Sequence, residues 1–159
     1  MKNLKVEFEE NDVGVLTLMT KVKELNVIPA RLSKKKNQDL YGLTVRTAGW
    51  GTSNDDETPL FKQTAFLSIL TMEQCEKNYE SLTGNKLRFA RIYLCTIAKP
   101  YVLATCGNSG GPLFYKHNTI LGINKGFCPK SADPTDMMNI HVGIDYYRGF
   151  ILDVKNNIH

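Results

Sequence analysis

The sequence has no apolar run that approaches the roughly 20 residues of a membrane-spanning helix, so we expect no transmembrane segment and no membrane partner. It also has no internal repeat, no low-complexity tract and no linker rich in proline or serine. We therefore expect residues 1–159 to form one domain or part of one. Residues 1–10, MKNLKVEFEE, alternate apolar and charged side chains and do not resemble a signal peptide.

Basic residues exceed acidic ones only slightly, since 20 Lys and Arg against 16 Asp and Glu give a net charge of +4. The one compact basic run is Lys34–Lys36, which lies between Ser33 and Asn37 and is typical of a solvated turn. A nucleic-acid surface needs basic residues interleaved with aromatic ones, or a recognisable binding module. The sequence shows neither, so we expect no nucleic-acid partner.

The four cysteines lack the CxxC spacing of a zinc site, and we expect neither a metal nor a cofactor. An even number of cysteines fits two disulfides and an oxidising compartment, while four buried free thiols are the alternative. The cysteines thus favour a secreted protein, whereas the first ten residues do not look like a secretion signal. We therefore expect that Met1 is not the native start. The cysteines are Cys75, Cys95, Cys106 and Cys128.

Alternation of apolar and polar residues dominates the sequence and predicts an all-β fold. Two segments follow a helical period instead. The first starts at Thr71 and places Met72, Cys75 and Tyr79 on one face, and the second runs from Tyr146 to Val154. We therefore expect one short internal helix and one C-terminal helix. Strands are predicted at residues 4–8, 13–18, 43–47, 60–66 and 113–115.

The motif with the clearest chemistry is Gly107–Pro112, which reads GNSGGP. Glycines on both sides of a serine let the backbone turn tightly, so that the hydroxyl is exposed and successive N–H groups point at one place. This arrangement suits a nucleophile beside an oxyanion hole. The alternatives are a plain glycine-rich turn and an anion-binding nest, while the Lys-Ser/Thr of a nucleotide-binding loop is missing.

GNSGGP resembles the GDSGGP motif of the trypsin/chymotrypsin-like serine peptidases, and further segments resemble family motifs in the same order. NDVGVL at 11–16 is similar to the segment around the triad aspartate, VIPA at 27–30 follows at the expected distance, and AGWG at 48–51 is similar to S-G-W-G. Residues 142–151 resemble the last strand and the closing helix. The resemblance implies an incomplete trypsin-like double β-barrel, made of the C-terminal barrel and part of the N-terminal one.

This resemblance also implies roles for individual residues. Ser109 would be the nucleophile, the N–H groups of Gly107 and Ser109 would form the oxyanion hole, and Asp12 would orient the base. Taken without the family, Asp12 is a surface acid that caps a turn. The implied disulfides are Cys75–Cys95 and Cys106–Cys128. The implied specificity pocket has Leu103, Ala104 and Thr105 at its base and Asn124, Lys125 and Gly126 in its wall, with no acid to select Arg or Lys.

The sequence departs from the family pattern at the base that would activate Ser109. The catalytic histidine precedes the triad aspartate in this family, yet none of the eleven residues before Asp12 is histidine. We expect that about the first third of a two-barrel domain is missing. His117, His141 and His159 cannot take this role by their position in the chain, and each is expected to be an exposed polar residue.

Two further departures concern the serine motif itself. Asn108 replaces the aspartate that pairs with the N-terminal ammonium after activation cleavage in this family. Cys106 directly precedes Gly107, whereas the family usually has one residue between them. Both changes put the geometry of the oxyanion hole in question.

Two functions follow, and both place the native protein outside the cell. The first is a serine endopeptidase, inactive as this chain because the histidine is missing, with a protein or peptide substrate. The second is a non-catalytic serine protease homologue that binds a protease, an inhibitor or another component of a proteolytic cascade. The retained Ser109 and Asp12 favour the first function. Asn108, the altered oxyanion turn and the altered pocket favour the second. An unrelated intracellular β protein is the remote alternative.

Overall fold

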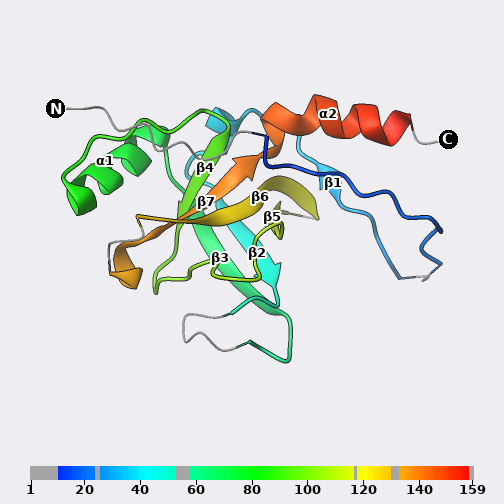
Figure 1. Cartoon of the computed structure of the whole chain (residues 1–159), viewed down its shortest axis with the longest axis horizontal. Helices are drawn as coiled ribbons and strands as arrows, with labels where there is room; N and C mark the ends of the chain where they lie inside the picture. Colours follow the sequence, from blue (N-terminus) through cyan, green and yellow to red (C-terminus); the bar gives the residue numbers. More distant parts are fainter. Residues whose placement is uncertain (1–10, 24–25, 53–57, 117, 130–132, 158–159) are drawn as a thin grey trace.

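The computed structural model describes residues 11–23, 26–52, 58–116, 118–129 and 133–157. In this part of the chain six strands close into an antiparallel barrel, in the order β6-β5-β2-β3-β4-β7 with β7 paired back to β6 (Figure 1). A short strand β1 adds to β6 in parallel. The strands are β1 (Arg31–Leu32), β2 (Thr44–Gly49), β3 (Gln63–Ile69), β4 (Tyr93–Ile97), β5 (Pro112–Tyr115), β6 (Thr119–Cys128) and β7 (Met138–Gly143).

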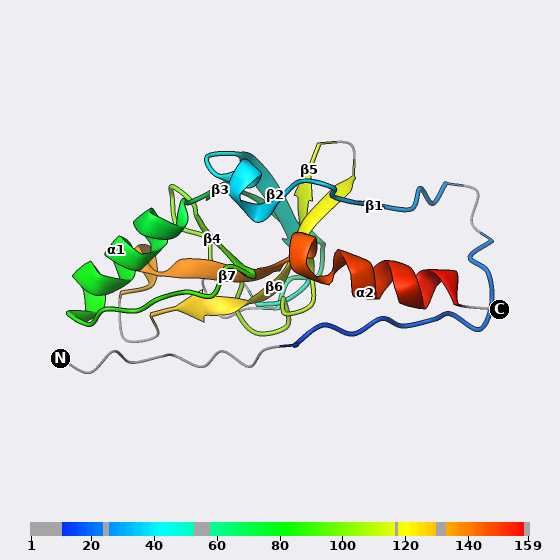
Figure 2. The same ribbon diagram turned by 90° about the horizontal axis from the view of Figure 1, so that it is seen from above.

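Two α-helices lie at the periphery of the barrel, as the sequence predicts (Figures 1 and 2). α1 (Met72–Thr83) begins after Thr71, whose hydroxyl accepts the Gln74 N–H while the Gln74 side chain accepts the Thr71 N–H, so the cap is a reciprocal capping box. It ends at Gly84, which is left-handed with φ of 69°. α2 (Ile144–Asn156) follows β7 directly. Two short 3-10 helices, Asn37–Leu40 and Pro134–Asp136, complete the described elements.

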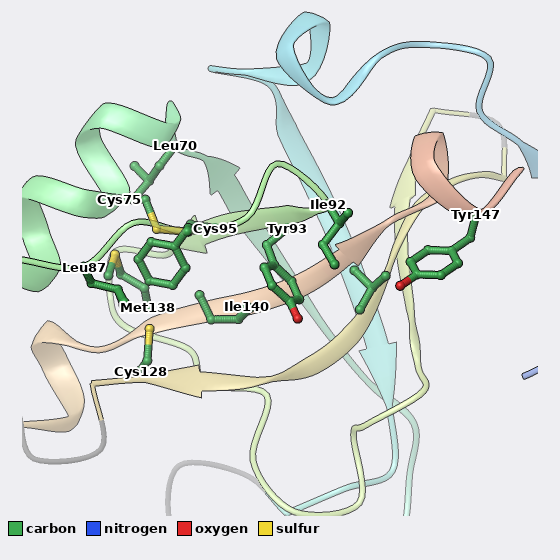
Figure 3. Packing of buried hydrophobic residues seen from close by; sticks show 12 residues of the cluster. Leu70, Cys75, Leu87, Ile92, Tyr93, Cys95, Cys128, Met138, Ile140 and Tyr147 are labelled. Atoms are coloured by element: carbon green, nitrogen blue, oxygen red, sulfur yellow. A yellow bond between two sulfur atoms is a disulfide. The ribbon is translucent and has the colours of Figure 1, made fainter. Parts of the chain in front are cut away.

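Two clusters of buried apolar side chains hold the barrel together. One cluster comes mainly from β4, β6 and β7 and from the segments packed on them, and it includes the Cys75–Cys95 disulfide that ties α1 to β4 (Figure 3). The other cluster consists of Leu40, Val45, Leu67, Ile69, Leu94, Leu113 and Leu121, most of which belong to the strands β2 to β6. Alternation along these strands therefore directs one row of side chains into the core.

The strand predictions for residues 43–47 and 113–115 are confirmed by β2 and β5. The prediction for 60–66 is correct only in its second half, because β3 begins at Gln63, while Leu60 and Phe61 are 92% and 80% exposed. The prediction for 13–18 is wrong: this segment pairs with no strand among the described residues, and Leu16 is 95% exposed. The segment 4–8 lies outside the described residues.

The chain before β1 leaves the barrel and returns to it. Figures 1 and 2 show that the described residues between 11 and 30 run outward on the side of α2 and turn back to β1. At the barrel end of this segment the Asn11 N–H donates to the Tyr147 hydroxyl at 3.0 Å, and Val13 packs against the first core cluster. Lys34–Lys36 are exposed, as predicted for a solvated turn. The segment is thus attached to the barrel near residues 11–13.

Candidate active site

The Ser109 turn is built on two glycines with left-handed backbone. Gly107 and Gly110 have φ of +83° and +79°, a conformation that side-chain-bearing residues seldom adopt. The Asn108 N–H donates to the Thr105 carbonyl at 3.1 Å, and the Gly110 N–H donates to the Asn124 carbonyl at 2.8 Å. These bonds close the turn on itself and fasten it to β6. Ser109 is exposed at its surface.

The amide N–H groups of Gly107 and Ser109 have no hydrogen-bond acceptor among the residues that the structure describes. Their neighbours differ, since the N–H groups of Asn108, Gly110 and Gly111 all donate to backbone carbonyls. Two donors on alternate residues are thus left available at the exposed turn. This is what the predicted oxyanion hole requires, and its role stays a prediction.

The Ser109 hydroxyl donates to the backbone carbonyl of Lys125, with Oγ and O 3.4 Å apart. The same lysine binds Asp12, because its Nζ lies 2.6 Å from Asp12 Oδ2. The register of β6 against β7 shifts between Asn124 and Gly126, so Lys125 sits at a β-bulge, where a side chain can be aimed out of the strand ladder. Asp12 and Ser109 thus contact the same residue, Asp12 at the Lys125 ammonium and Ser109 at the Lys125 backbone carbonyl, and the catalytic roles of both stay predictions.

The expectation that His141 is an exposed polar residue is wrong, because its relative exposure is 0%. Its Nε2 lies 2.8 Å from Thr96 Oγ1 and its Nδ1 lies 2.9 Å from Asn124 Oδ1. Burial lowers the pKa of His141 to about 3, so the imidazole is neutral. Since the Asn124 oxygen can only accept, Nδ1 donates and Nε2 accepts from Thr96. His117 and His159 lie outside the described residues.

Asn124 holds the serine turn in place through hydrogen bonds of its side chain and its backbone. Its side-chain amide donates to the Asn108 carbonyl at 3.2 Å and to Thr47 Oγ1 at 3.0 Å. Its backbone N–H donates to the Gly111 carbonyl at 2.8 Å, and its carbonyl accepts the Gly110 N–H. The sequence predicts Asn124 as part of the pocket wall but does not predict these hydrogen bonds to the serine turn. They depend on how β5, β6 and β7 pair.

Among the described residues, the Asn108 side chain is hydrogen-bonded to two neutral backbone groups, those of Gly51 and Thr52. Its Oδ1 accepts the Gly51 N–H at 3.2 Å, and its Nδ2 donates to the Thr52 carbonyl at 3.3 Å. A carboxylate here would set an oxygen against the Thr52 carbonyl, so the amide is the group that fits. A Cβ on Gly49 or Gly51 would collide with Asn108, which explains why both positions are glycine.

Leu103 and Ala104, from the base of the predicted specificity pocket, line a cleft beside β2 and β3 together with Val102 and Asn108. The specificity pocket itself stays a prediction. The Ala104 N–H donates to Asn139 Oδ1 at 2.6 Å, and Asn139 Nδ2 donates to the Val102 carbonyl at 2.7 Å. Thr105 bonds to Thr52 instead. Two buried side chains on β7 thus contact the predicted pocket residues, Asn139 at the base through Ala104 and His141 at the wall through Asn124.

Comparison with known proteins agrees with this barrel. The profile of the Trypsin family matches residues 1–151. This chain belongs to the trypsin family. Neuropsin, a serine protease expressed in the limbic system of mouse brain, has a similar fold with a TM-score of 0.65 and 23% identity, over 81% of this chain and 54% of that chain. The scabies mite inactivated protease paralogue S-I1 gives a TM-score of 0.64 and 19% identity, over 87% of this chain and 57% of that one.

The trypsin-family chain thus spans a little more than half the length of these two proteins. Membership and the trypsin-like barrel predicted from the sequence are confirmed. The roles of Asp12, Gly107 and Ser109 stay predictions. Within the described part of this chain, no helix has the length and apolar character needed to cross a membrane.

Of the two disulfides that the family resemblance implies, Cys75–Cys95 is confirmed and Cys106–Cys128 is wrong. Cys106 is exposed on the turn, where its carbonyl accepts the Thr52 N–H at 2.9 Å. Cys128 is 5% exposed and lies in the core with Met138 and Ile140 (Figure 3). One thiol is thus held at the surface and the other in the interior. Burial raises the pKa of Cys128 to about 12, so this thiol stays protonated.

Proposed function

We propose that this trypsin-family chain is a non-catalytic serine protease homologue that acts outside the cell by binding a protein or peptide partner. The observation that carries the proposal is the partner of the Ser109 hydroxyl. That partner is a backbone carbonyl, that of Lys125, at 3.4 Å. A carbonyl accepts a hydrogen bond but does not take up a proton, so it cannot activate the hydroxyl as a nucleophile.

The surrounding residues support the same proposal. The Asp12 carboxylate, which would have to orient an imidazole, is paired with the Lys125 ammonium. His141 is buried, and both of its ring nitrogens are engaged by Thr96 and Asn124. The scabies mite relative is an inactivated protease by its own description, so this barrel also occurs in a protein without the ancestral activity.

Serine endopeptidase activity is the second candidate, and the exposed turn favours it. Ser109 is accessible, and the N–H groups of Gly107 and Ser109 are available as oxyanion donors. A base from outside the described residues could complete such a site. The proposal of binding without catalysis therefore concerns the site as described, in which Ser109 donates to the Lys125 carbonyl and Asp12 pairs with the Lys125 ammonium.

Labelling with a peptidyl phosphonate separates the two functions, because the reagent bonds only to an activated serine. We expect the chain to react no faster than its Ser109→Ala variant, and to hydrolyse peptide esters at the rate of that variant. A positioned base is typically worth 10²–10⁴-fold in rate, so its lack is easily measured. Rapid stoichiometric labelling of Ser109, mapped by mass spectrometry, would establish the endopeptidase instead.

A further inference from the structure

Strand pairing brings three side chains into one row on the outer face of the barrel. Arg46 on β2 is paired with Phe66 on β3 and, on its other side, with Phe114 on β5. Leu67 and Leu113, the neighbours of the two phenylalanines in the chain, are buried in the core, so alternation directs the row outward. Phe66 is 71% exposed, and the Arg46 guanidinium carbon lies 6.0 Å from the centre of the Phe114 ring. An arginine thus lies between two phenylalanines on an open face of the sheet.

This row lines a groove that continues past the end of β5. The outer groove consists of Arg46, Phe66 and Phe114 together with Thr44, Val45, Tyr115, Lys116 and Asn118. The Lys116 Nζ lies 5.3 Å from the centre of the Tyr115 ring, so a second cation also faces an aromatic ring. None of the described residues that line the groove is acidic, and neither cation forms an ion pair with a described residue. The outer groove therefore carries two positive charges that no carboxylate of the described structure balances.

These groups favour a partner that presents carboxylates together with apolar side chains. A guanidinium can bind a carboxylate through two parallel hydrogen bonds, and rings beside it exclude water, which strengthens the pair relative to an open surface. The rings also offer apolar area that a purely charged polymer would leave uncovered. A nucleic acid or a sulfated polysaccharide carries closely spaced charges and gains its affinity from many basic contacts, whereas this groove offers two. The chemistry of the groove therefore fits a protein segment better than a polyanion.

We propose that the outer groove is a docking site for a protein partner and binds an extended segment in which acidic residues alternate with apolar ones. Lys116 follows Phe114, the cross-strand partner of Arg46, by two positions, which matches the spacing of alternate side chains in an extended peptide. Carboxylates would pair with the two cations while apolar side chains cover the rings. Arginine and aromatic residues are also the types that contribute most to binding in protein interfaces.

This inference goes beyond the proposed function, because it assigns partner binding to a surface separate from the serine turn. None of the residues 107–112 lines the outer groove. The inference therefore holds whether or not Ser109 is activated, and the two can be tested separately.

The test uses two synthetic peptides that differ only in charge. Acetyl-GLEFELG-amide alternates apolar and acidic residues, and acetyl-GLQFQLG-amide has glutamine in place of both glutamates. Both ends are capped, so that no terminal charge takes part. Ligand-observed saturation-transfer NMR with dilute protein and excess peptide gives each Kd. We expect the acidic peptide to bind about tenfold tighter than the neutral one, because two partly desolvated charge pairs distinguish them.

Substitutions in the groove separate the contribution of charge from that of the rings. Arg46→Gln should remove most of the preference for the acidic peptide while the affinity for the neutral peptide changes little. Phe66→Ser should weaken both peptides severalfold and leave the charge preference in place. Both side chains are exposed, so the barrel should fold normally. The matched controls are Arg91→Gln and Phe61→Ser, whose side chains are exposed and do not line the groove.

Each result decides a separate point. Equal affinities for the two peptides, or an acid preference that survives in Arg46→Gln, would overturn the proposal. Tighter binding of a thymidine oligonucleotide or a heparin fragment, lost in Arg46→Gln, would assign the groove to a polyanion instead. Self-association that disappears in Arg46→Gln during sedimentation would assign it to a second copy of this chain. Rapid phosphonate labelling of Ser109 would contradict the proposed function alone, whereas equal peptide affinities would contradict only this inference.

Discussion

Single residues in this chain owe their chemistry to burial more than to their type. His141 and Cys128 belong to the residue types that most often act as bases and nucleophiles, yet burial lowers the pKa of the first to about 3 and raises that of the second to about 12. Both are therefore neutral in the folded protein near pH 7. Ser109, by contrast, is exposed, and its hydroxyl donates to a backbone carbonyl, which cannot take up the proton. The candidate site thus keeps an accessible hydroxyl but separates it from the histidine that the structure describes.

The neutral, buried state of His141 predicts that the protein loses stability as pH falls below about 6.5. The unfolded chain takes up a proton on this histidine near its ordinary pKa of 6.5, while the folded chain does not until about pH 3. Between these values the unfolded state binds more protons, so the free energy of unfolding decreases as pH decreases, by up to about 1.4 kcal/mol per pH unit. Above pH 6.5 the term is constant.

Urea unfolding at pH 7 and pH 5 measures this effect before most carboxylates titrate. We expect the free energy of unfolding to be about 2 kcal/mol lower at pH 5. The variant His141→Gln keeps a polar side chain but cannot titrate, and its difference between the two pH values should be much smaller. The same difference in the variant as in the natural chain would mean that other groups, not His141, cause the pH dependence.

At the scale of elements, local hydrogen bonds cap both ends of α1, and the contribution of each bond to stability can be measured with a single substitution. Thr71→Ala removes the hydroxyl that accepts the Gln74 N–H at 3.1 Å, and we expect a loss of about 1 kcal/mol in the free energy of unfolding. Ser81→Ala in the same helix is the matched control, since the Ser81 hydroxyl donates only to the Asn78 carbonyl on an exposed surface. Denaturation of both variants, with the disulfide intact, is the measurement. Equal stability of the two would show that the capping box contributes nothing to the fold.

The sequence predicts best the elements whose signals lie close together in the chain. The helix after Thr71 follows from its cap and its 3.6 period, and β2 and β5 follow from alternation. Residues 13–18 alternate in the same way, but a strand needs a neighbour, and none is present for them in the described structure. The two disulfides are implied by the family resemblance, and Cys106–Cys128 does not form because Cys106 is exposed on the turn while Cys128 is buried in the core.

The candidate site is predictable from sequence only as far as its motif extends. GNSGGP indicates the turn, its glycines and its exposed serine, and the structure shows all three. The partner of Asp12 is 113 positions away in the chain, and the side chain of His141 enters the site region from a different strand. Such contacts depend on strand pairing and on the β6 bulge, which alternation does not specify. For this reason the burial of His141 and the Asp12–Lys125 ion pair are found only in the structure.

At the scale of the whole molecule, large apolar side chains remain exposed outside the barrel core. Leu60 and Phe61 precede β3, and Leu16 and Met19 lie in the segment that runs outward before β1. All four are at least 80% exposed. Isolated apolar residues are normal on protein surfaces. Large exposed apolar residues that lie close together within one segment, as in each of these two, are typical of an interface or a site of aggregation.

We therefore expect the purified chain to self-associate as its concentration rises from about 1 to 100 μM, because association buries apolar area worth roughly 25 cal/mol per Å². Sedimentation velocity measures the effect. The double variant Leu60→Ser and Phe61→Ser should shift association to higher concentration, and Leu16→Ser with Met19→Ser tests the outward segment in the same way. Each substitution lies outside the core, so circular dichroism should show the barrel unchanged. A natural chain that sediments as a monomer over the whole range would show that neither segment is an interface between copies, and the difference between the two double variants identifies which segment carries the contact.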